Sequence, residues 1–225
     1  MHYFVDVWQG SLQCSANRWE LMFNLLSDDE RLKAEGCRSD QMRQRFVMSR
    51  GMLRQTLASY LSIAPNELRF ELGEFGKPGL ANEGLHFNLS HTADNWLLAV
   101  SNFADIGVDL EVIRPRTQLQ SLVERCFSRR ELVYWQTLPS DQQLEGFFRL
   151  WTKKEAFVKA VGRGLALGLE HCEFEPQPAG QLLAIPSDYG EARAWCVREL
   201  VLAPALMGVL VTPNRDYELR YFVLA

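Results

Sequence analysis

The sequence predicts an α+β fold, in which helices and strands are segregated along the chain. Helical patterns occupy most of residues 17–61 and 117–161, and strand patterns follow them at 68–113 and 171–224. This order lacks the strand–helix–strand alternation that a parallel α/β sheet requires. The chain has 225 residues, of which 47% are hydrophobic. It is therefore long enough to bury one large core or two small ones.

The first half is expected to begin with a short strand at residues 3–8 and to continue with three helices. These helices are predicted at 17–26, 28–36 and 40–61. Ser27 and Glu30 form a capping-box pattern at the start of the second helix, where each side chain satisfies a free backbone amide. The third helix carries four arginines, and most of them are expected to be solvated.

Short strands and one irregular loop are predicted next. Residues 73–79, Gly-Glu-Phe-Gly-Lys-Pro-Gly, contain too much glycine and proline for regular structure, so they are predicted to form a loop that a ligand can approach closely. The strands around this loop are expected at 68–72, 85–90 and 95–102. In the second half, helices are predicted at 117–126, 128–138 and 140–161, followed by strands at 171–176, 182–186, 192–201, 205–212 and 217–224.

The strand predicted at residues 106–113 carries two acidic side chains on one face. Asp109 and Glu111 are two positions apart in Ile-Gly-Val-Asp-Leu-Glu-Val-Ile, and the alternation of a strand puts both on the same side. Two neighbouring carboxylates repel each other and lose hydration when they are buried. Either this strand lies at a sheet edge with the acidic face in water, or a cation or basic partner neutralises the pair.

The helix predicted at residues 140–161 places a third carboxylate in line with a lysine. Trp151, Glu155 and Lys159 follow one another at four-residue steps, so they share one helical face. Such a stripe on its own is typical of a solvated surface with an ion pair. Together with the two strand carboxylates it indicates a site for a hard divalent cation, because Mg²⁺ binds a few carboxylates and keeps positions for water and phosphate oxygens.

Two upstream motifs accompany these acidic residues. Residues 76–78 read Gly-Lys-Pro, and residues 88–91 read Asn-Leu-Ser-His. With the Asp-Leu-Glu strand and the Trp-Thr-Lys-Lys-Glu helix, they resemble in order and spacing the signature of the 4'-phosphopantetheinyl transferases of the surfactin-synthetase-activating type. Four motifs in one order are far more specific than any one of them.

This resemblance implies two similar α+β subdomains related by a pseudo-twofold axis, with the active site in the cleft between them. Residues 1–103 would contact the nucleotide of coenzyme A, and residues 104–225 would carry the metal and catalytic residues. The implied reaction transfers the 4'-phosphopantetheine arm of coenzyme A to a serine of an apo carrier protein of the acyl, peptidyl or aryl type. It depends on Mg²⁺ and releases 3',5'-ADP.

The resemblance also implies roles for side chains of the second half. Asp109, Glu111 and Glu155 would hold Mg²⁺, and Lys159 would stabilise or protonate the leaving phosphate. Glu155 is favoured as the base that takes the serine proton. Glu131 is the alternative base, although Ser128-Arg-Arg-Glu131 is also a capping-box pattern.

Basic residues of the first half are implied to bind the phosphates of coenzyme A. Arg45 is the best positional match at the 3'-phosphate, Lys33 or Arg31 is a weaker match, and His91 would contact the same phosphate. The other residues expected to contact coenzyme A are Lys77, Pro78, Ser90 and Lys154. A docking surface for an acidic carrier protein is expected at Arg116, Arg125, Arg129 and Arg130.

Two other functions require the same residues. A Mg²⁺-dependent hydrolase of a nucleotide pyrophosphate would use the same carboxylates but would turn over without a protein acceptor. A non-catalytic module that binds coenzyme A or a carrier protein would tolerate the loss of a metal carboxylate, and none is missing here.

Composition argues against several further classes of protein. The net charge is −4 and no basic patch is interleaved with aromatic residues, so nucleic acid is not an expected partner. No apolar run approaches the roughly 20 residues that cross a bilayer, and the first residues lack a basic leader. The protein is therefore expected to be cytoplasmic and free of membrane. We also expect a monomer. Its five cysteines are scattered, so we expect reduced thiols and no zinc.

Overall fold

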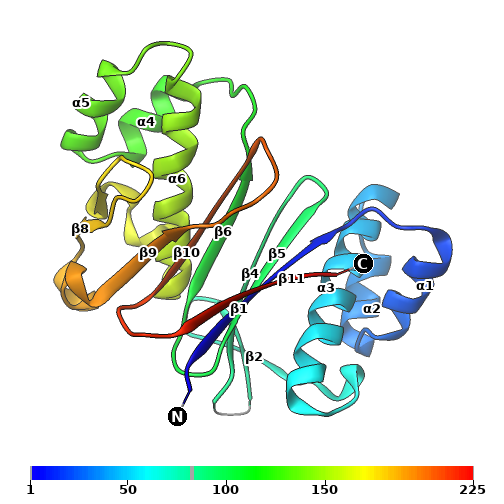
Figure 1. The fold of residues 1–225 in the computed structure, drawn as a ribbon. Helices are drawn as coiled ribbons and strands as arrows, with labels where there is room; N and C mark the ends of the chain where they lie inside the picture. Colours follow the sequence, from blue (N-terminus) through cyan, green and yellow to red (C-terminus); the bar gives the residue numbers. More distant parts are fainter. Residues whose placement is uncertain (1, 82–83, 225) are drawn as a thin grey trace.

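Two sheets face each other between two layers of helices in the computed structural model, which describes residues 2–81 and 84–224 (Figure 1). Apolar side chains of both sheets meet in a central core, which includes Val5, Leu97, Val108 and Leu210. Two further cores lie between each sheet and its own helices. The predicted α+β class is confirmed.

The first sheet has four strands in the order β11-β1-β5-β4. Its strands are β1 (Phe4–Ser11), β4 (His86–Thr92), β5 (Asn95–Ser101) and β11 (Glu218–Val223). The helices that cover it are α1 (Ala16–Asn24), α2 (Asp28–Glu35) and α3 (Asp40–Leu61). The predicted capping box at the start of α2 is confirmed, because the amide of Ser27 donates to Glu30 at 3.2 Å.

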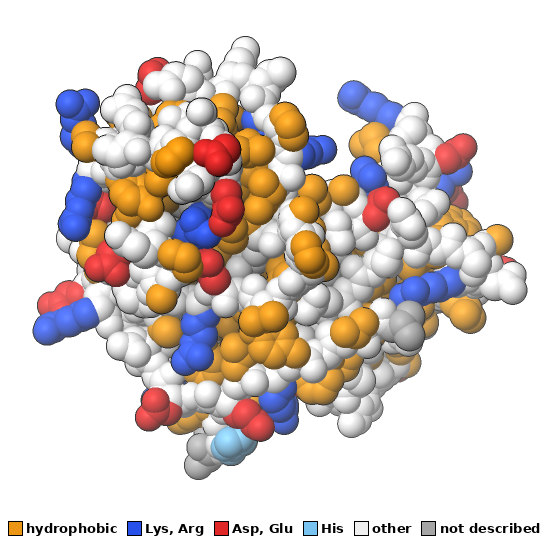
Figure 2. All heavy atoms as spheres, turned by 45° about the horizontal axis from the view of Figure 1, so that its top comes forward, with side chains coloured by type: hydrophobic (Ala, Val, Ile, Leu, Met, Phe, Trp, Pro, Cys, Tyr) orange, Lys and Arg blue, Asp and Glu red, His pale blue; other side chains and the backbone are white. Residues whose placement is uncertain are grey.

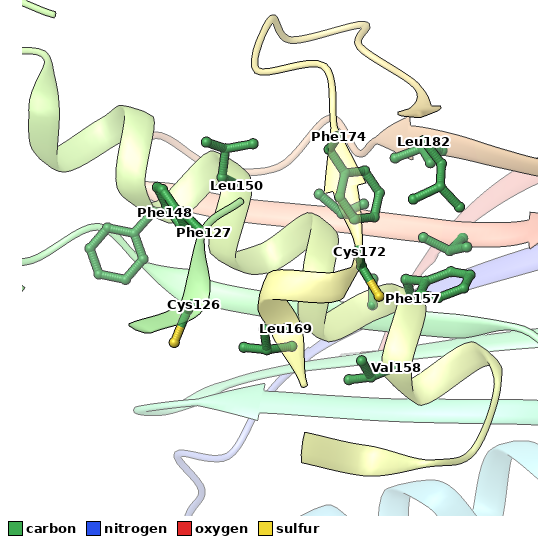
Figure 3. Close-up of a cluster of buried hydrophobic side chains, with 14 of the residues drawn as sticks. Cys126, Phe127, Phe148, Leu150, Phe157, Val158, Leu169, Cys172, Phe174 and Leu182 are labelled. Carbon is green, nitrogen blue, oxygen red and sulfur yellow. The ribbon is translucent and has the colours of Figure 1, made fainter. Parts of the chain in front are cut away.

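The second sheet has three antiparallel strands in the order β6-β10-β9. These strands are β6 (Gly107–Val112), β9 (Trp195–Glu199) and β10 (Leu206–Pro213), and the helices beside them are α4 (Leu119–Cys126), α5 (Arg129–Thr137) and α6 (Gln143–Ala160). Aromatic side chains such as Phe148, Phe157 and Phe174 fill the space between α6 and the segments around it (Figure 3). A small pair of strands, β7 (Glu173–Phe174) and β8 (Leu182–Ala184), closes this core.

The last strand returns to the sheet of the first half. β11 pairs in parallel with β1, with Phe4 opposite Glu218 and Trp8 opposite Phe222. An ion pair reinforces this contact, since Arg220 donates to the buried carboxylate of Asp6 at 2.6 and 2.8 Å. The two ends of the chain are therefore held together in one sheet.

The segment predicted to be an irregular loop at 73–79 is part of a hairpin. β2 (Phe70–Leu72) pairs with β3 (Pro78–Leu80), and Gly73 donates its amide to Lys77 O at 2.9 Å to close the turn. Gly76 has a φ of +82°, which explains the glycine at the tip. The loop prediction was wrong for residues 78–79, which begin β3, because proline is tolerated at the first position of a strand.

Other differences from the predicted elements are small. α6 begins at Gln143, three residues later than expected, and α4 begins at Leu119. The strand predicted at 192–201 begins with a 3₁₀ turn at Ala192–Ala194 before β9. In residues 2–81 and 84–224, no helix combines the length and apolar character that a bilayer-spanning helix needs.

Candidate active site

β4 and β6 belong to different sheets and are joined by hydrogen bonds from backbone amides of β6 to side chains of β4. Asn88 Oδ1 accepts from the amide of Val108 at 2.8 Å, and Ser90 Oγ accepts from the amide of Leu110 at 3.2 Å. Both side chains are buried, so these bonds satisfy backbone donors that have no water. The Asn-Leu-Ser-His motif therefore fixes the junction between the two halves.

Close contact between β6 and α6 brings the predicted catalytic residues together. A Cβ atom on Gly107 would lie 1.9 Å from Ala156 O and 2.4 Å from Ala160 N, so only glycine allows this approach. α6 consequently lies directly over β6. The acidic face of the strand meets the face of the helix that carries Glu155 and Lys159.

A three-way contact forms at the centre of this junction. Lys159 Nζ donates to Asp109 Oδ1 at 2.6 Å and to Ser90 Oγ at 3.0 Å, and Ser90 Oγ donates to the same Asp109 oxygen at 2.9 Å. β4, β6 and α6 each supply one of these side chains. Sequence analysis grouped Asp109 with Lys159, but it assigned Ser90 to coenzyme A alone.

The second strand carboxylate, Glu111, is held by a different set of donors. Trp151 Nε1 donates to Glu111 Oε1 at 3.1 Å, and Arg116 Nη2 donates to the same oxygen at 3.3 Å. The Arg116 guanidinium also lies over the rings of Phe148 and Trp151. Arg116 therefore belongs to this site, whereas the remaining arginines of the expected docking surface, Arg125, Arg129 and Arg130, are exposed.

Burial and neighbouring charges raise the pKa values of two site carboxylates, Glu155 and Glu111. Burial and the charges of Asp109 and Glu111 together raise the pKa of Glu155 to about 7, against the opposing effect of Lys159. Burial and the charge of Asp109 also raise the pKa of Glu111, while Arg116 opposes this. The charge of Asp109 therefore acts on both Glu111 and Glu155, which places the three carboxylates in one electrostatic environment.

The carboxylates offer part of a metal site. Asp109 Oδ2 is buried and has no hydrogen-bond partner among the described residues, which leaves a free ligand atom in the site. Within residues 2–81 and 84–224, however, no three His, Cys, Asp or Glu side chains converge as they do around a bound metal. Lys159 takes the place of a cation at the other oxygen of Asp109. The donor set suits a hard divalent cation.

Two predicted site residues are paired with each other away from this junction. Lys154 Nζ lies 2.7 Å from Glu131 Oε2, and both side chains are fully buried. Lys154 also donates to Leu169 O at 2.9 Å, and Glu131 accepts from the amides of Ser128 at 2.7 Å and Phe174 at 2.8 Å. In this structure the Lys154 ammonium is thus occupied by Glu131 and backbone carbonyls, and Glu131 forms the predicted capping box.

Three cationic or titratable groups gather near the end of β4. The His91 ring is exposed in part, and its pKa is lowered by loss of hydration and by the positive charges of Lys159 and Arg45. Arg45 Nε is paired with Asp94 at 2.9 Å. This concentration of positive charge suits a phosphate group, although Arg45 would have to share its guanidinium with Asp94.

The remaining residues predicted to contact coenzyme A lie at the β2–β3 hairpin and on α2. Pro78 and Lys33 line one cavity of about 490 Å³. Lys33 is exposed and lies 3.5 Å from Asp29. Lys77 donates to Ile106 O at 3.1 Å and to Ala160 O at 3.0 Å, so its ammonium points toward backbone carbonyls. Its predicted contact with the nucleotide is not supported by this orientation.

A buried ion cluster that was not predicted from the sequence lies beside this cavity. Arg54 is 2% exposed and donates to Glu30 at 2.5 Å, and Arg50 also pairs with Glu30. Both guanidinium groups lie over the ring of Phe70. Solvation was the wrong expectation for these two arginines. Their four-residue spacing was a signal, because it puts both on one helical face.

Charges on the visible face are intermixed. Figure 2 shows Lys and Arg side chains alternating with Asp and Glu over both halves, and a hollow between the halves at the top of the view.

Comparison with known proteins agrees with this geometry in both halves of the chain. Residues 105–218 match the family model described as the 4'-phosphopantetheinyl transferase superfamily, and residues 8–103 match the model described as 4'-phosphopantetheinyl transferase, N-terminal. The chain belongs to the 4'-phosphopantetheinyl transferase superfamily.

Several curated proteins are similar to this transferase over most of its length. The 4'-phosphopantetheinyl transferase HetI of Nostoc sp. is 38% identical over 201 residues, which cover 88% of this chain and 82% of HetI. AcpT of Escherichia coli K12 is 37% identical over 59% of this chain and 71% of its own. Sfp of Bacillus subtilis 168 is 26% identical over 72% of each chain.

Proposed function

We propose that this transferase moves the 4'-phosphopantetheine arm of coenzyme A to a serine hydroxyl of an apo carrier protein and releases 3',5'-ADP. Membership of the superfamily supports the reaction. The observation that carries the proposal is the meeting of Asp109, Lys159 and Ser90 at the junction of β4, β6 and α6. Residues 1–103 would bind the nucleotide, and residues 104–225 would supply the reacting groups.

Proton removal falls to Glu155 in this proposal. Burial raises the pKa of Glu155 to about 7 in the absence of metal, and a bound cation would lower it. The side chain would then be ionised and able to accept a proton at neutral pH. The bond from the serine oxygen to the β-phosphorus of coenzyme A forms as the bond from that phosphorus to the bridging oxygen breaks. The serine proton moves to Glu155, and the leaving oxygen stays on 3',5'-ADP. Lys159 would neutralise the charge that develops on the phosphates.

A divalent cation fits the donor set of this site. Asp109, Glu111 and Glu155 would hold Mg²⁺, and the unpartnered Asp109 Oδ2 supports this assignment. When bound, the ion would polarise the pyrophosphate oxygens and offset their charge. Arg116 and Trp151 both donate to Glu111 Oε1 and so fix the orientation of this carboxylate. Arg45 and His91 would receive the 3'-phosphate.

Transfer is tested by incubating the protein with coenzyme A, Mg²⁺ and a panel of apo carrier proteins. The expected result is a gain in the intact mass of a carrier equal to one phosphopantetheine group, together with release of 3',5'-ADP. A carrier whose acceptor serine is replaced by alanine is the matched control and should stay unmodified. Cleavage of coenzyme A without any carrier would indicate a hydrolase, and binding without cleavage would indicate a binding module.

A further inference from the structure

Lys77 joins three segments that are far apart in the sequence. It lies next to β3 in the turn of the β2–β3 hairpin, and its Nζ reaches Ile106 O at 3.1 Å and Ala160 O at 3.0 Å. Ile106 directly precedes β6, and Ala160 is the last residue of α6. The side chain is only 14% exposed, so its ammonium is largely withheld from solvent.

The carbonyl of Ala160 needs a donor from outside α6, because Ala160 is the last residue of that helix. The last carbonyls of a helix have no partner within it, and a cation at this end also interacts favourably with the helix dipole. Burial lowers the pKa of Lys77, because the charged form loses hydration, and the charge of Asp105 opposes this. The two carbonyls replace the lost water.

The residues that Lys77 contacts are adjacent to the reacting groups. Ala160 follows Lys159, and Ile106 precedes Gly107, the point at which the backbone of α6 touches β6. The Lys77 side chain itself packs against this region, since a Cβ on Gly162 would lie 3.4 Å from Lys77 Cδ. One ammonium thus ties the end of the helix that carries Lys159 to the start of the strand that carries Asp109.

We propose that Lys77 is a positioning residue that fixes α6 against β6 and thereby sets the contact between Lys159 and Asp109. It acts through its two carbonyl contacts and does not bind the phosphates of coenzyme A. The inference rests on the proposed function, because the residues that it positions are those assigned to the transfer. Its neighbour Pro78 lines the 490 Å³ cavity, so the same hairpin faces the cavity on one side and the catalytic helix on the other.

The test compares Lys77→Met, which removes the ammonium, with Lys77→Arg, which keeps a cationic donor. Arg193→Met is the control for loss of a surface charge, because Arg193 is 86% exposed and pairs with Glu191 in its own turn. Hydrogen exchange of the amides at 161–163 is measured without ligand. These amides donate to Phe157, Lys159 and Val158 in the last turn of α6.

Lys77→Met should speed exchange of these amides roughly tenfold, the effect of losing one charge-assisted contact. It should lower kcat by roughly a hundredfold, because a small misplacement of reacting groups is costly, and leave the Kd of coenzyme A nearly unchanged. Lys77→Arg should restore most of the slow exchange and most of kcat. Arg193→Met should change neither the exchange rate nor kcat. If Lys77→Met does not fold, Lys77→Gln is measured in the same way.

Two results would overturn the assignment. A higher Kd for coenzyme A with unchanged kcat and exchange would make Lys77 a ligand contact. A lower Tm with wild-type kcat in the folded fraction would make its role purely structural. Failure of the proposed function is seen separately, as absence of carrier modification by the wild type, and the exchange experiment needs no carrier.

Discussion

Lys159 and Asp109 form an ion pair with Nζ 2.6 Å from Oδ1, at the point where α6 crosses β6. Asp109 is 5% exposed, and its second oxygen has no partner among the described residues. One oxygen therefore serves the lysine and the other is available to a cation. The pair thus brings together a carboxylate that can bind a metal ion, Asp109, and an ammonium that can neutralise a phosphate, Lys159.

Replacing Asp109 tests this link directly. Asp109→Ala leaves the Lys159 ammonium and the Ser90 hydroxyl without their shared acceptor, so it should abolish transfer and cost about 1–3 kcal/mol of unfolding free energy. The repulsion between Asp109 and its neighbouring carboxylates acts in the opposite direction, because removing one charge relieves it. Urea unfolding at pH 7 measures the difference. A gain in stability would show that repulsion outweighs the ion pair.

Glu155→Gln separates the base from the metal ligand. The variant keeps one coordinating oxygen and loses basicity, so kcat should fall by roughly a hundredfold while binding of coenzyme A is retained. Wild-type turnover by the variant would rule out Glu155 as the base.

The raised pKa of Glu155 predicts a pH dependence of stability that the same variant can reveal. The folded pKa of about 7 lies above the ordinary value of 4.5, so the folded protein binds more protons than the unfolded chain between these pH values. The favourable contribution of protonated Glu155 is present below pH 4.5 and is lost as pH rises to about 7. In EDTA, the Tm of Glu155→Gln minus that of the wild type should therefore increase between pH 4.5 and about 7 and remain constant at higher pH. A constant difference between pH 4.5 and 8 would contradict the raised pKa.

Trp151→Phe tests the orientation of Glu111. Phenylalanine keeps the packing on Phe147 but removes the indole donor, whose Nε1 lies 3.1 Å from Glu111 Oε1. Loss of a group that orients a metal ligand typically weakens metal affinity by roughly 10–100-fold. The Mg²⁺ concentration for half-maximal transfer should rise accordingly, with little change in Tm. An unchanged Mg²⁺ requirement would show that Arg116 alone orients the carboxylate.

The sequence was informative where local geometry decides the outcome. Strand alternation put Asp109 and Glu111 together, and helical spacing put Glu155 and Lys159 on one face. The spacing also indicates that Lys154 points away from this face. It precedes Glu155 by one residue, and one residue along a helix rotates the side-chain direction by about 100°.

Contacts between distant segments could not be predicted in this way. Glu131 and Lys154 form a pair only because α5 packs on α6, and Lys77 finds its acceptors only because the β2–β3 hairpin lies against the end of α6. The charge of a lysine is visible in the sequence, but its acceptors depend on the tertiary fold. Motif resemblance therefore identified the reaction more reliably than the role of each basic residue.

Recognition of the 3'-phosphate is expected to depend on Arg45 and His91. The wild type should bind coenzyme A more tightly than dephospho-coenzyme A by about 2 kcal/mol, the value of a lost charge-assisted contact. Arg45→Gln should remove most of this preference, because it should weaken the binding of coenzyme A more than the binding of dephospho-coenzyme A. Calorimetry with both ligands measures the two affinities. Equal binding of both by the wild type would refute the assignment.

The buried pair of Glu131 and Lys154 should govern stability and leave the chemistry intact. Both side chains are fully buried, and Lys154 also holds the carbonyls of Leu169 and Cys172. Lys154→Met should destabilise the fold by about 3–5 kcal/mol, because it strands the Glu131 carboxylate without its cation.

The double variant Lys154→Met with Glu131→Gln distinguishes a structural pair from a phosphate contact. It removes both charges, so it should recover part of the lost stability, and the amide can still accept from Phe174 N. The folded fraction of either variant should keep the wild-type KM for coenzyme A. If Lys154→Met instead raises this KM tenfold at full occupancy of the folded state, Lys154 contacts the phosphates and the buried pair must open during the reaction.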